Sequence, residues 1–82
     1  MIIKYFAWIK SITKIEEEII NEKSITDVNS LKKFLQKKYP ELQKHLKKNM
    51  IRIAINLNYT SKNDKINTDD EVAIFPPVSG GE

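Results

Sequence analysis

The sequence predicts a single small domain of the α+β class, in which one main helix packs on a face of an antiparallel-rich sheet. The chain has 82 residues, which is enough for one core and too few for two. Its most apolar segments, 2–8 and 71–75, lie near opposite ends of the chain, and a helical pattern lies between them. Strand, strand, helix, strand, strand is an order typical of α+β domains.

The first two strands are predicted at the start of the chain. Residues 2–8, IIKYFAW, are rich in β-branched and aromatic side chains and contain no breaker, so they predict a buried strand. The segment TKIEEEII, 13–20, has a spacing that suits a strand as well as a helix, but its short length and the following Asn21 favour a hairpin partner for the first strand. The intervening IKSITK contains no tight-turn dipeptide, so we expect a loop longer than two residues.

The main helix is predicted at residues 27–39, DVNSLKKFLQKKY. Asp27 or Thr26 provides the N-cap, and Pro40 ends the helix. Its apolar residues recur at intervals of three and four, as on one face of an amphipathic helix. They are Val28, Leu31, Phe34 and Leu35.

The second half of the chain predicts one more helical turn and two more strands. Residues 40–48 keep two leucines four apart, which suits a short helix, and 50–57, MIRIAINL, predict a strand. Residues 58–64 are turn-rich, and a turn at 68–70 precedes the last strand, 71–75.

The first strand is too apolar to lie at an edge of the sheet. If the first and last strands lie side by side in its middle, the order is that of the ubiquitin-like β-grasp. We therefore expect a mixed sheet of four to five strands with one main helix packed on one face. Residues 1–75 would form this domain, and residues 76–82 would form an extended C-terminal tail with a diglycine.

Composition excludes several classes of function. The chain contains no cysteine and one histidine, His45, so thiolate nucleophiles, histidine triads and clustered metal ligands are not expected, and we expect no bound metal. His45 is predicted to be a solvated helix residue. No apolar run approaches a membrane span, and the start lacks the features of a signal peptide, which favours a cytoplasmic protein without a membrane partner. The net charge of +3 suggests at most an acidic partner.

The tail, FPPVSGGE from Phe75 onward, has the composition of a segment that another protein holds. Pro76 and Pro77 fix two backbone angles and favour an extended stalk. Gly80 and Gly81 have no Cβ, so a narrow channel can enclose their backbone. The competing interpretation is a frayed end, in which the prolines merely stop a strand.

The string DEVAIFPPVSGG closely resembles the C-terminus of the MoaD-type sulfur carriers, the small subunits of molybdopterin synthase. The resemblance extends through IAINLNY, the TDVNSLKKFLQKKYP helix and the opening IIKYFAWIK, although only the last dozen positions are specific. It implies that Gly81 is adenylated with ATP by a MoeB-type, ubiquitin-activating-like enzyme and then converted to a thiocarboxylate. No cofactor is expected on the chain itself.

The resemblance also implies how the sulfur is delivered. The tail, with Pro76, Pro77, Val78, Ser79 and Gly80 leading to Gly81, would enter a MoaE-type large subunit and donate sulfur to cyclic pyranopterin monophosphate. Two small and two large subunits would form a heterotetramer, and the catalytic side chains would belong to the partners.

Two positions depart from the family pattern. The family ends at the second glycine, whereas Glu82 here follows Gly81 and would leave it as an amide. Removal of Glu82 by a peptidase or an artificial origin is favoured over activation of Glu82 itself. Asp69 stands where the family usually has glycine, and aspartate tolerates left-handed conformations better than most residues.

Phe6, Tyr59 and Phe75 fall at positions similar to an exposed apolar patch that the family uses against both partners. Aromatic side chains are common interface anchors, and the alternative is that some of the three, Phe6 in particular, belong to the core. The lysines at 32, 33, 37, 38, 44, 47 and 48 raise a nucleic-acid-binding alternative, but no RNA motif accompanies them, so we expect no nucleic-acid partner. The nearer alternatives are a ThiS-type carrier for thiazole synthesis and a ubiquitin-like protein modifier.

Overall fold

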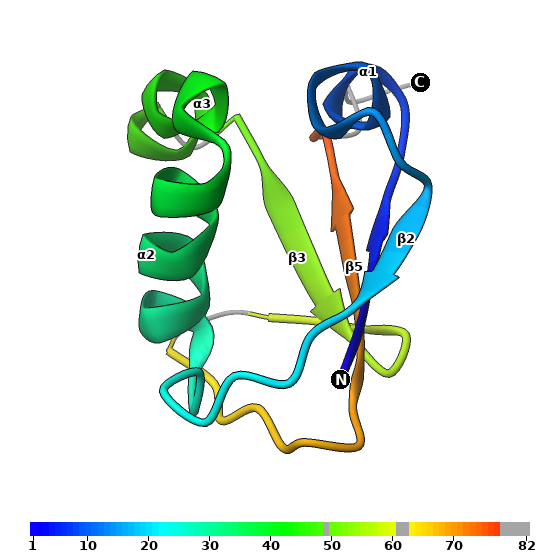
Figure 1. Cartoon of the computed structure of the whole chain (residues 1–82), viewed down its shortest axis with the longest axis vertical. Helices are drawn as coiled ribbons and strands as arrows, with labels where there is room; N and C mark the ends of the chain where they lie inside the picture. Colours follow the sequence, from blue (N-terminus) through cyan, green and yellow to red (C-terminus); the bar gives the residue numbers. More distant parts are fainter. Residues whose placement is uncertain (49, 61–62, 78–82) are drawn as a thin grey trace.

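The computed structural model describes residues 1–48, 50–60 and 63–77, and these form a β-grasp domain with a sheet on one side and the main helix on the other (Figure 1). The predicted α+β class and β-grasp arrangement are confirmed. In chain order the elements are β1 (Ile2–Tyr5), α1 (Trp8–Thr13), β2 (Glu17–Ile19), α2 (Val28–Lys38), the 3₁₀ helix η1 (Pro40–Leu42), α3 (Gln43–Lys47), β3 (Arg52–Ile55), β4 (Asn58–Tyr59) and β5 (Glu71–Phe75).

The described strands form one five-stranded sheet in the order β2-β1-β5-β3-β4. The two end strands of the sequence, β1 and β5, lie side by side near the middle and run parallel, with Ile3 opposite Val72. The other pairs, β1 with β2, β5 with β3 and β3 with β4, are antiparallel. The predicted pairing of the first and last strands, and that of the first two strands, are both confirmed.

The main helix begins where the sequence predicts it. The Asp27 side chain accepts a hydrogen bond from the Ser30 backbone N–H at 2.8 Å, and the Ser30 hydroxyl accepts one from the Asp27 N–H at 3.0 Å. This capping box satisfies two backbone donors that the helix leaves unpaired. Val28, Leu31 and Leu35 face inward, so the predicted apolar stripe is the buried face of α2.

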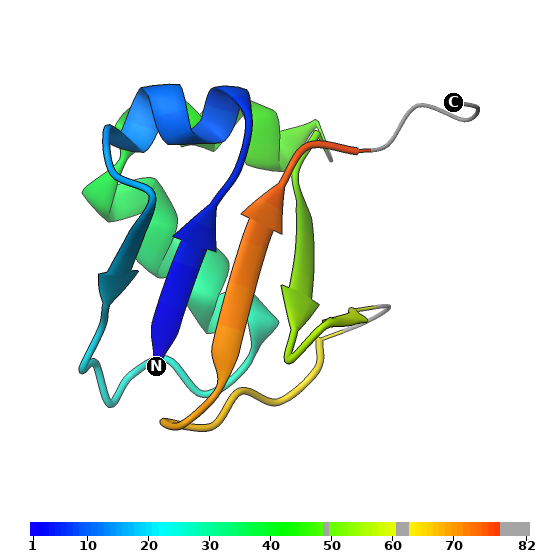
Figure 2. The ribbon, with the colours of Figure 1, turned by 90° about the vertical axis from the view of Figure 1, so that its right-hand side faces the viewer.

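The core lies between α2 and one face of the sheet (Figure 1). In β1 and β5, alternate side chains point toward α2, and these are buried. The innermost hydrophobic residues, at 0% to 4% exposure, are Ile3, Tyr5, Ile9, Ile25, Val28, Leu31, Leu35, Leu42, Ile53, Val72 and Ile74. The opposite face of the sheet, which we call the open face, is not covered by a helix of the described chain (Figure 2).

The predicted first strand, 2–8, is too long, because β1 ends at Tyr5 and Trp8–Thr13 form the helix α1. Ala7 has a φ of 56°, which reverses the chain after Phe6. The IKSITK segment, expected to be a loop, is therefore mostly helical. Its helical form is favoured by tertiary packing, since Ile9 is fully buried and Thr13 is also buried. Lys14, in the left-handed region with a φ of 68°, ends the helix.

The predicted strand 50–57 is also shorter in the structure. β3 spans Arg52–Ile55, and Asn56 and Leu57 both have positive φ values, 50° and 72°, as in the tight turn of a hairpin. The chain then continues as β4, so part of the segment expected to be only turns pairs with β3. The asparagine side chain supports this turn, because its Oδ1 accepts a hydrogen bond from the Glu71 N–H at 2.9 Å.

Candidate functional site

The candidate site begins where β5 ends. β5 is paired with β1 on one side and β3 on the other, and it points toward the end of the molecule where α1 lies (Figures 1 and 2). The Phe6 N–H extends this pairing with a hydrogen bond to the Ile74 carbonyl at 3.0 Å. A segment that follows this strand starts from one of the most constrained parts of the sheet.

Pro76 and Pro77 are the last described residues, and both are half-buried. Each proline fixes φ near −65°, which lowers the backbone entropy lost when the following residues are ordered in a partner. The other predicted tail positions, Val78, Ser79, Gly80 and Gly81, lie outside the described residues, as does Glu82. Their roles stay predictions.

Two of the three predicted patch residues meet on the open face. The rings of Tyr59 on β4 and Phe75 on β5 are 5.5 Å apart between centroids, with an angle of 41° between their planes. Tyr59 is 74% exposed, and Phe75 is half-buried. With Arg52 and Thr60 they line a hollow of about 290 Å³, which we call the Arg52 hollow. This aromatic pair lies directly beside the start of the tail.

Phe6 is not a core residue, since 47% of its surface is exposed. It lines a separate hollow of about 270 Å³, together with Lys4, Ala7 and Lys10 among others. The structure therefore places all three predicted aromatics within reach of a partner but joins only Tyr59 and Phe75 in one hollow. A role for the three in partner binding stays a prediction.

The far end of the open face is more polar. Lys4 on β1 pairs with Glu71 on β5, with 3.5 Å between Nζ and Oε2. Glu17 lies opposite Lys4 on the other side, and the neighbouring Ile19 is 71% exposed. A partner that approached along the tail would meet the aromatic end of β5 before this ion pair.

A cluster that sequence reasoning missed ties the edge strand β2 to the helix side of the sheet. Glu18 accepts hydrogen bonds from the hydroxyls of Tyr5 at 2.5 Å and Tyr39 at 2.7 Å, and from the Lys38 ammonium at 2.6 Å. The rings of Tyr5 and Tyr39 also pack edge to face at 5.8 Å. The three donors come from β1, the end of α2 and the residue after it, so no local pattern predicts the cluster.

The cluster changes the acidity of its members. Burial would raise the pKa of Glu18, but the bonds from Lys38, Tyr5 and Tyr39 outweigh it, and the pKa is lowered. Burial and the bond to Glu18 raise the pKa of Tyr39 to about 12, and the same causes raise the pKa of Tyr5. At neutral pH Glu18 is therefore charged and both tyrosines are protonated. In this state the cluster holds β2 to β1 and to the end of α2.

His45 was predicted to be solvated, and this is wrong in part. It is half-buried and lies against Trp8, with ring centroids 4.6 Å apart, so it joins α3 to α1. Among residues 1–48, 50–60 and 63–77, no group of histidines and acids is arranged to hold a metal ion. No helix in this same part of the chain is long and apolar enough to cross a bilayer.

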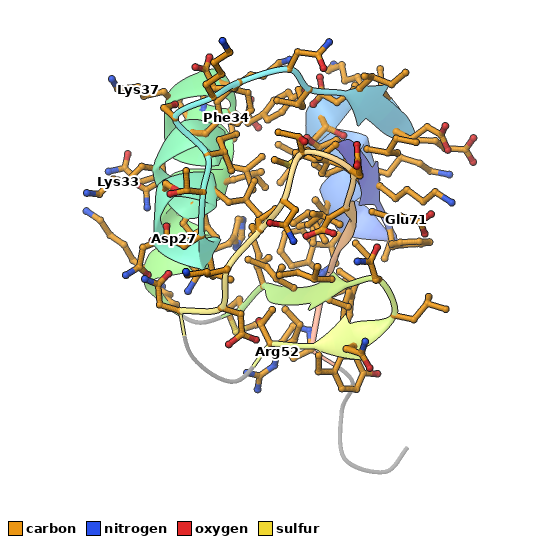
Figure 3. All side chains as sticks on the ribbon, turned by 90° about the horizontal axis from the view of Figure 1, so that it is seen from below. Asp27, Lys33, Phe34, Lys37, Arg52 and Glu71 are labelled. Atoms are coloured by element: carbon orange, nitrogen blue, oxygen red, sulfur yellow. The ribbon has the colours of Figure 1, made fainter. Side chains whose placement is uncertain are left out.

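The lysines of α2 lie away from the open face. Figure 3 shows Lys33 and Lys37 projecting from the outer side of α2, whereas Arg52 lies at a different edge of the molecule. Lys38 is held by Glu18. The basic residues of α2 and the aromatic pair therefore do not form one surface.

Comparison with known proteins places the chain in a family. The model of the ThiS family matches residues 3–81, so the chain belongs to the ThiS family. It is 33% identical over 67 residues to a molybdopterin synthase sulfur carrier subunit of Caenorhabditis briggsae, an alignment that covers 79% of this chain and 77% of that protein. It is 41% identical over 58 residues to the protein of the same name from Dictyostelium discoideum, covering 68% of this chain and 64% of that protein.

Solved structures agree on the fold. A Pyrococcus furiosus protein, provisionally assigned as molybdopterin converting factor subunit 1, superposes with a TM-score of 0.81 at 25% identity, covering 94% of this chain and 95% of that chain. Small archaeal modifier protein 1 of Methanosarcina acetivorans superposes with a TM-score of 0.75 at 27% identity. That superposition covers 98% of this chain and 94% of the Methanosarcina chain. A chain from a complex of subunits 1 and 2 of the Helicobacter pylori molybdopterin-converting factor superposes with a TM-score of 0.67 at 27% identity. That superposition covers 98% of this chain and 96% of the Helicobacter chain.

Proposed function

We propose that this member of the ThiS family is the sulfur-carrier small subunit of a molybdopterin synthase, with Gly81 as the residue that carries the sulfur. The observation that carries the proposal is the DEVAIFPPVSGG ending, which begins as the central strand β5. Curated relatives with the name of sulfur carrier subunit support it. The structural neighbour from Methanosarcina acetivorans, a small archaeal modifier protein, supports the alternative of a protein modifier.

In the proposed mechanism the chain provides the Gly81 carboxylate and a rigid strand, β5, from which the tail that carries it extends. An adenylating enzyme would join the Gly81 carboxylate to AMP and release pyrophosphate from ATP. A sulfur donor would then displace AMP and leave a thiocarboxylate. An acyl adenylate is a much better electrophile than a carboxylate, and glycine offers the least hindrance to the attacking sulfur.

The tail would next enter the large subunit, which supplies the catalytic side chains. There the thiocarboxylate would donate its sulfur to cyclic pyranopterin monophosphate, and Gly81 would return to a carboxylate. A heterotetramer of two small and two large subunits is part of this proposal. The Helicobacter pylori complex of subunits 1 and 2 supports a large-subunit partner.

The test is the intact mass of the full chain after incubation with ATP, a MoeB-type enzyme and a sulfur donor. With a cell extract added as the source of a peptidase, we expect hydrolysis of the Gly81–Glu82 bond and then replacement of one Gly81 oxygen by sulfur. Dithiolene formation should follow when a large subunit and the pterin substrate are added. Gly81→Ala should abolish transfer while leaving the melting temperature unchanged, and Lys33→Ala, on the outer side of α2, is the control that should transfer sulfur as wild type does. A retained Glu82 with no gain of sulfur would overturn the proposal, and conjugation to lysines would favour a protein modifier.

A further inference from the structure

We propose that Arg52 is a recognition residue for the large subunit, and that its guanidinium pairs there with a carboxylate of that subunit. The proposal rests on the proposed function, because it concerns the partner that receives the tail. It assigns a role to a residue outside the predicted aromatic patch.

The register of the sheet places Arg52 beside both aromatics of the patch. In the antiparallel pair β3–β5, Arg52 lies directly opposite Phe75. Tyr59 lies opposite Ala54, two residues further along β3 on the same face. These residues line the Arg52 hollow, so a cationic group and two aromatic rings share one site.

Among the described residues that line the hollow, Arg52 is the one charged group, and no ion pair engages it. Among the described residues the ion pairs are Lys4–Glu71, Lys10–Glu16 and Lys38–Glu18, and none includes Arg52. The Thr60 hydroxyl already donates to the Ile53 carbonyl at 3.0 Å. The guanidinium is exposed, so water solvates it in the isolated chain.

A partner that receives the tail must approach the Arg52 hollow. Phe75 lines the hollow and directly precedes Pro76, and six residues of extended chain place Gly81 within about 22 Å of Phe75. A protein interface of standard size covers about 800 Å² on each partner, which is a patch roughly 30 Å across. An interface around the tail therefore covers the aromatic pair and removes water from Arg52.

A guanidinium that loses its water needs an anionic partner. Burying a charge without one is strongly unfavourable, whereas the planar fork of arginine matches a carboxylate with two parallel hydrogen bonds. Among the described residues that line the hollow, Arg52 is a single cation beside two aromatic rings, an arrangement that suits a single carboxylate. A polyanion such as a nucleic acid would need several cations along one surface, and Lys33 and Lys37 lie elsewhere (Figure 3).

The experiment measures the affinity of the full chain for the isolated large subunit by calorimetry. Arg52→Met keeps an unbranched stem of similar shape without the charge, and we expect binding about tenfold weaker because the partner carboxylate is left unpaired. Arg52→Glu adds repulsion and should weaken binding about 30-fold or more. Arg52→Lys should fall between wild type and Arg52→Met. Lys33→Glu carries the same change of charge on α2 and should bind within about twofold of wild type.

The outcomes separate this inference from the proposed function. If wild type binds the large subunit and Arg52→Met binds equally well, the carboxylate pairing is wrong and the proposed function stands. If Lys33→Glu weakens binding as much as Arg52→Glu, only net charge matters, and the inference is again wrong. If wild type does not bind at all, both proposals fail. Circular dichroism and melting temperatures of each variant exclude misfolding, which is not expected for an exposed Arg52.

Discussion

Along β5, Val72 and Ile74 point toward α2 and are fully buried, whereas Glu71, Ala73 and Phe75 lie on the open face and stay partly accessible. The same strand thus supplies core residues and surface residues in alternation, because successive side chains of a strand point to opposite faces. The helix side holds the packed core and the Glu18 cluster, and the open face holds the Arg52 hollow. Stability and partner recognition should therefore respond to different substitutions on the same strands.

The largest effect on stability is expected from a substitution on the buried side of β5. Ile74→Ala removes fully buried methyl groups and should lower the free energy of unfolding by about 2–5 kcal/mol, because it leaves a cavity between β5 and α2. Ile74→Val, the matched control, should cost about 0.5–1.5 kcal/mol. Urea unfolding measures both, and a loss below 1 kcal/mol for the alanine variant would contradict the packing described, by the same scale.

The Glu18 cluster should make stability depend on pH. The pKa of Glu18 is lowered in the folded chain, so charged Glu18 contributes stability that is fully present at pH values above the usual glutamate pKa. This contribution is lost as the pH falls through the lowered pKa. Glu18→Gln should reduce the free energy of unfolding at pH 7 by about 1–3 kcal/mol, because it weakens charge-assisted hydrogen bonds. Asp27 also has a lowered pKa, so wild type and variant must be compared.

The check is a series of urea titrations from neutral to acid pH. The difference between wild type and Glu18→Gln should shrink as the pH falls. A difference that stays constant with pH would mean that Glu18 acts only through packing.

Substitutions on the open face should change binding to the large subunit more than they change stability. Phe75→Ala removes a half-buried ring beside the tail and should weaken binding to the large subunit about tenfold, as for an aromatic anchor, with about 1 kcal/mol lost in stability. Glu71→Gln, at the other end of β5 on the same face, is the control and should bind within about twofold of wild type. Equal binding by wild type and Phe75→Ala would remove the aromatic pair from the interface.

The smallest effect is expected in the β3–β4 turn, which belongs to neither face. Leu57 is 89% exposed and has a φ of 72°, a conformation that costs a residue with a Cβ about 1 kcal/mol. Leu57→Gly should therefore raise the free energy of unfolding by about 0.5–1 kcal/mol, whereas Leu57→Ala should not. A thermal melt of the three proteins measures this, and equal stability of the glycine and alanine variants would show that the turn carries no such strain.

Much of the fold could be predicted because its signals are local. The spacing of Val28, Leu31 and Leu35, with Asp27 before them and Pro40 after, specifies α2 without help from the rest of the chain. The apolar character of the first and last strands favoured their pairing inside the sheet, and the structure confirms this pairing. The predicted position of Phe75 beside the tail follows from the same strand assignment.

The sequence failed where distant segments decide the local structure. α1 forms because Ile9 and Thr13 are buried against the end of the sheet, and the strand pattern of residues 2–8 hides this. The half-burial of His45 depends on Trp8, which is 37 positions earlier in the sequence numbering. The residues that flank His45 in the sequence give no sign of Trp8, and those that flank Trp8 give no sign of His45.

The sequence by itself determined the class of fold, the main helix, the central pair of strands and a tail whose composition suits capture by a partner. Only the tertiary structure decided that Glu18 meets two tyrosines and a lysine, and that Arg52 shares a hollow with Tyr59 and Phe75. The physical reason is register. Periodicity determines which face of an element is buried, but the pairing of strands far apart in the chain determines which side chains become neighbours.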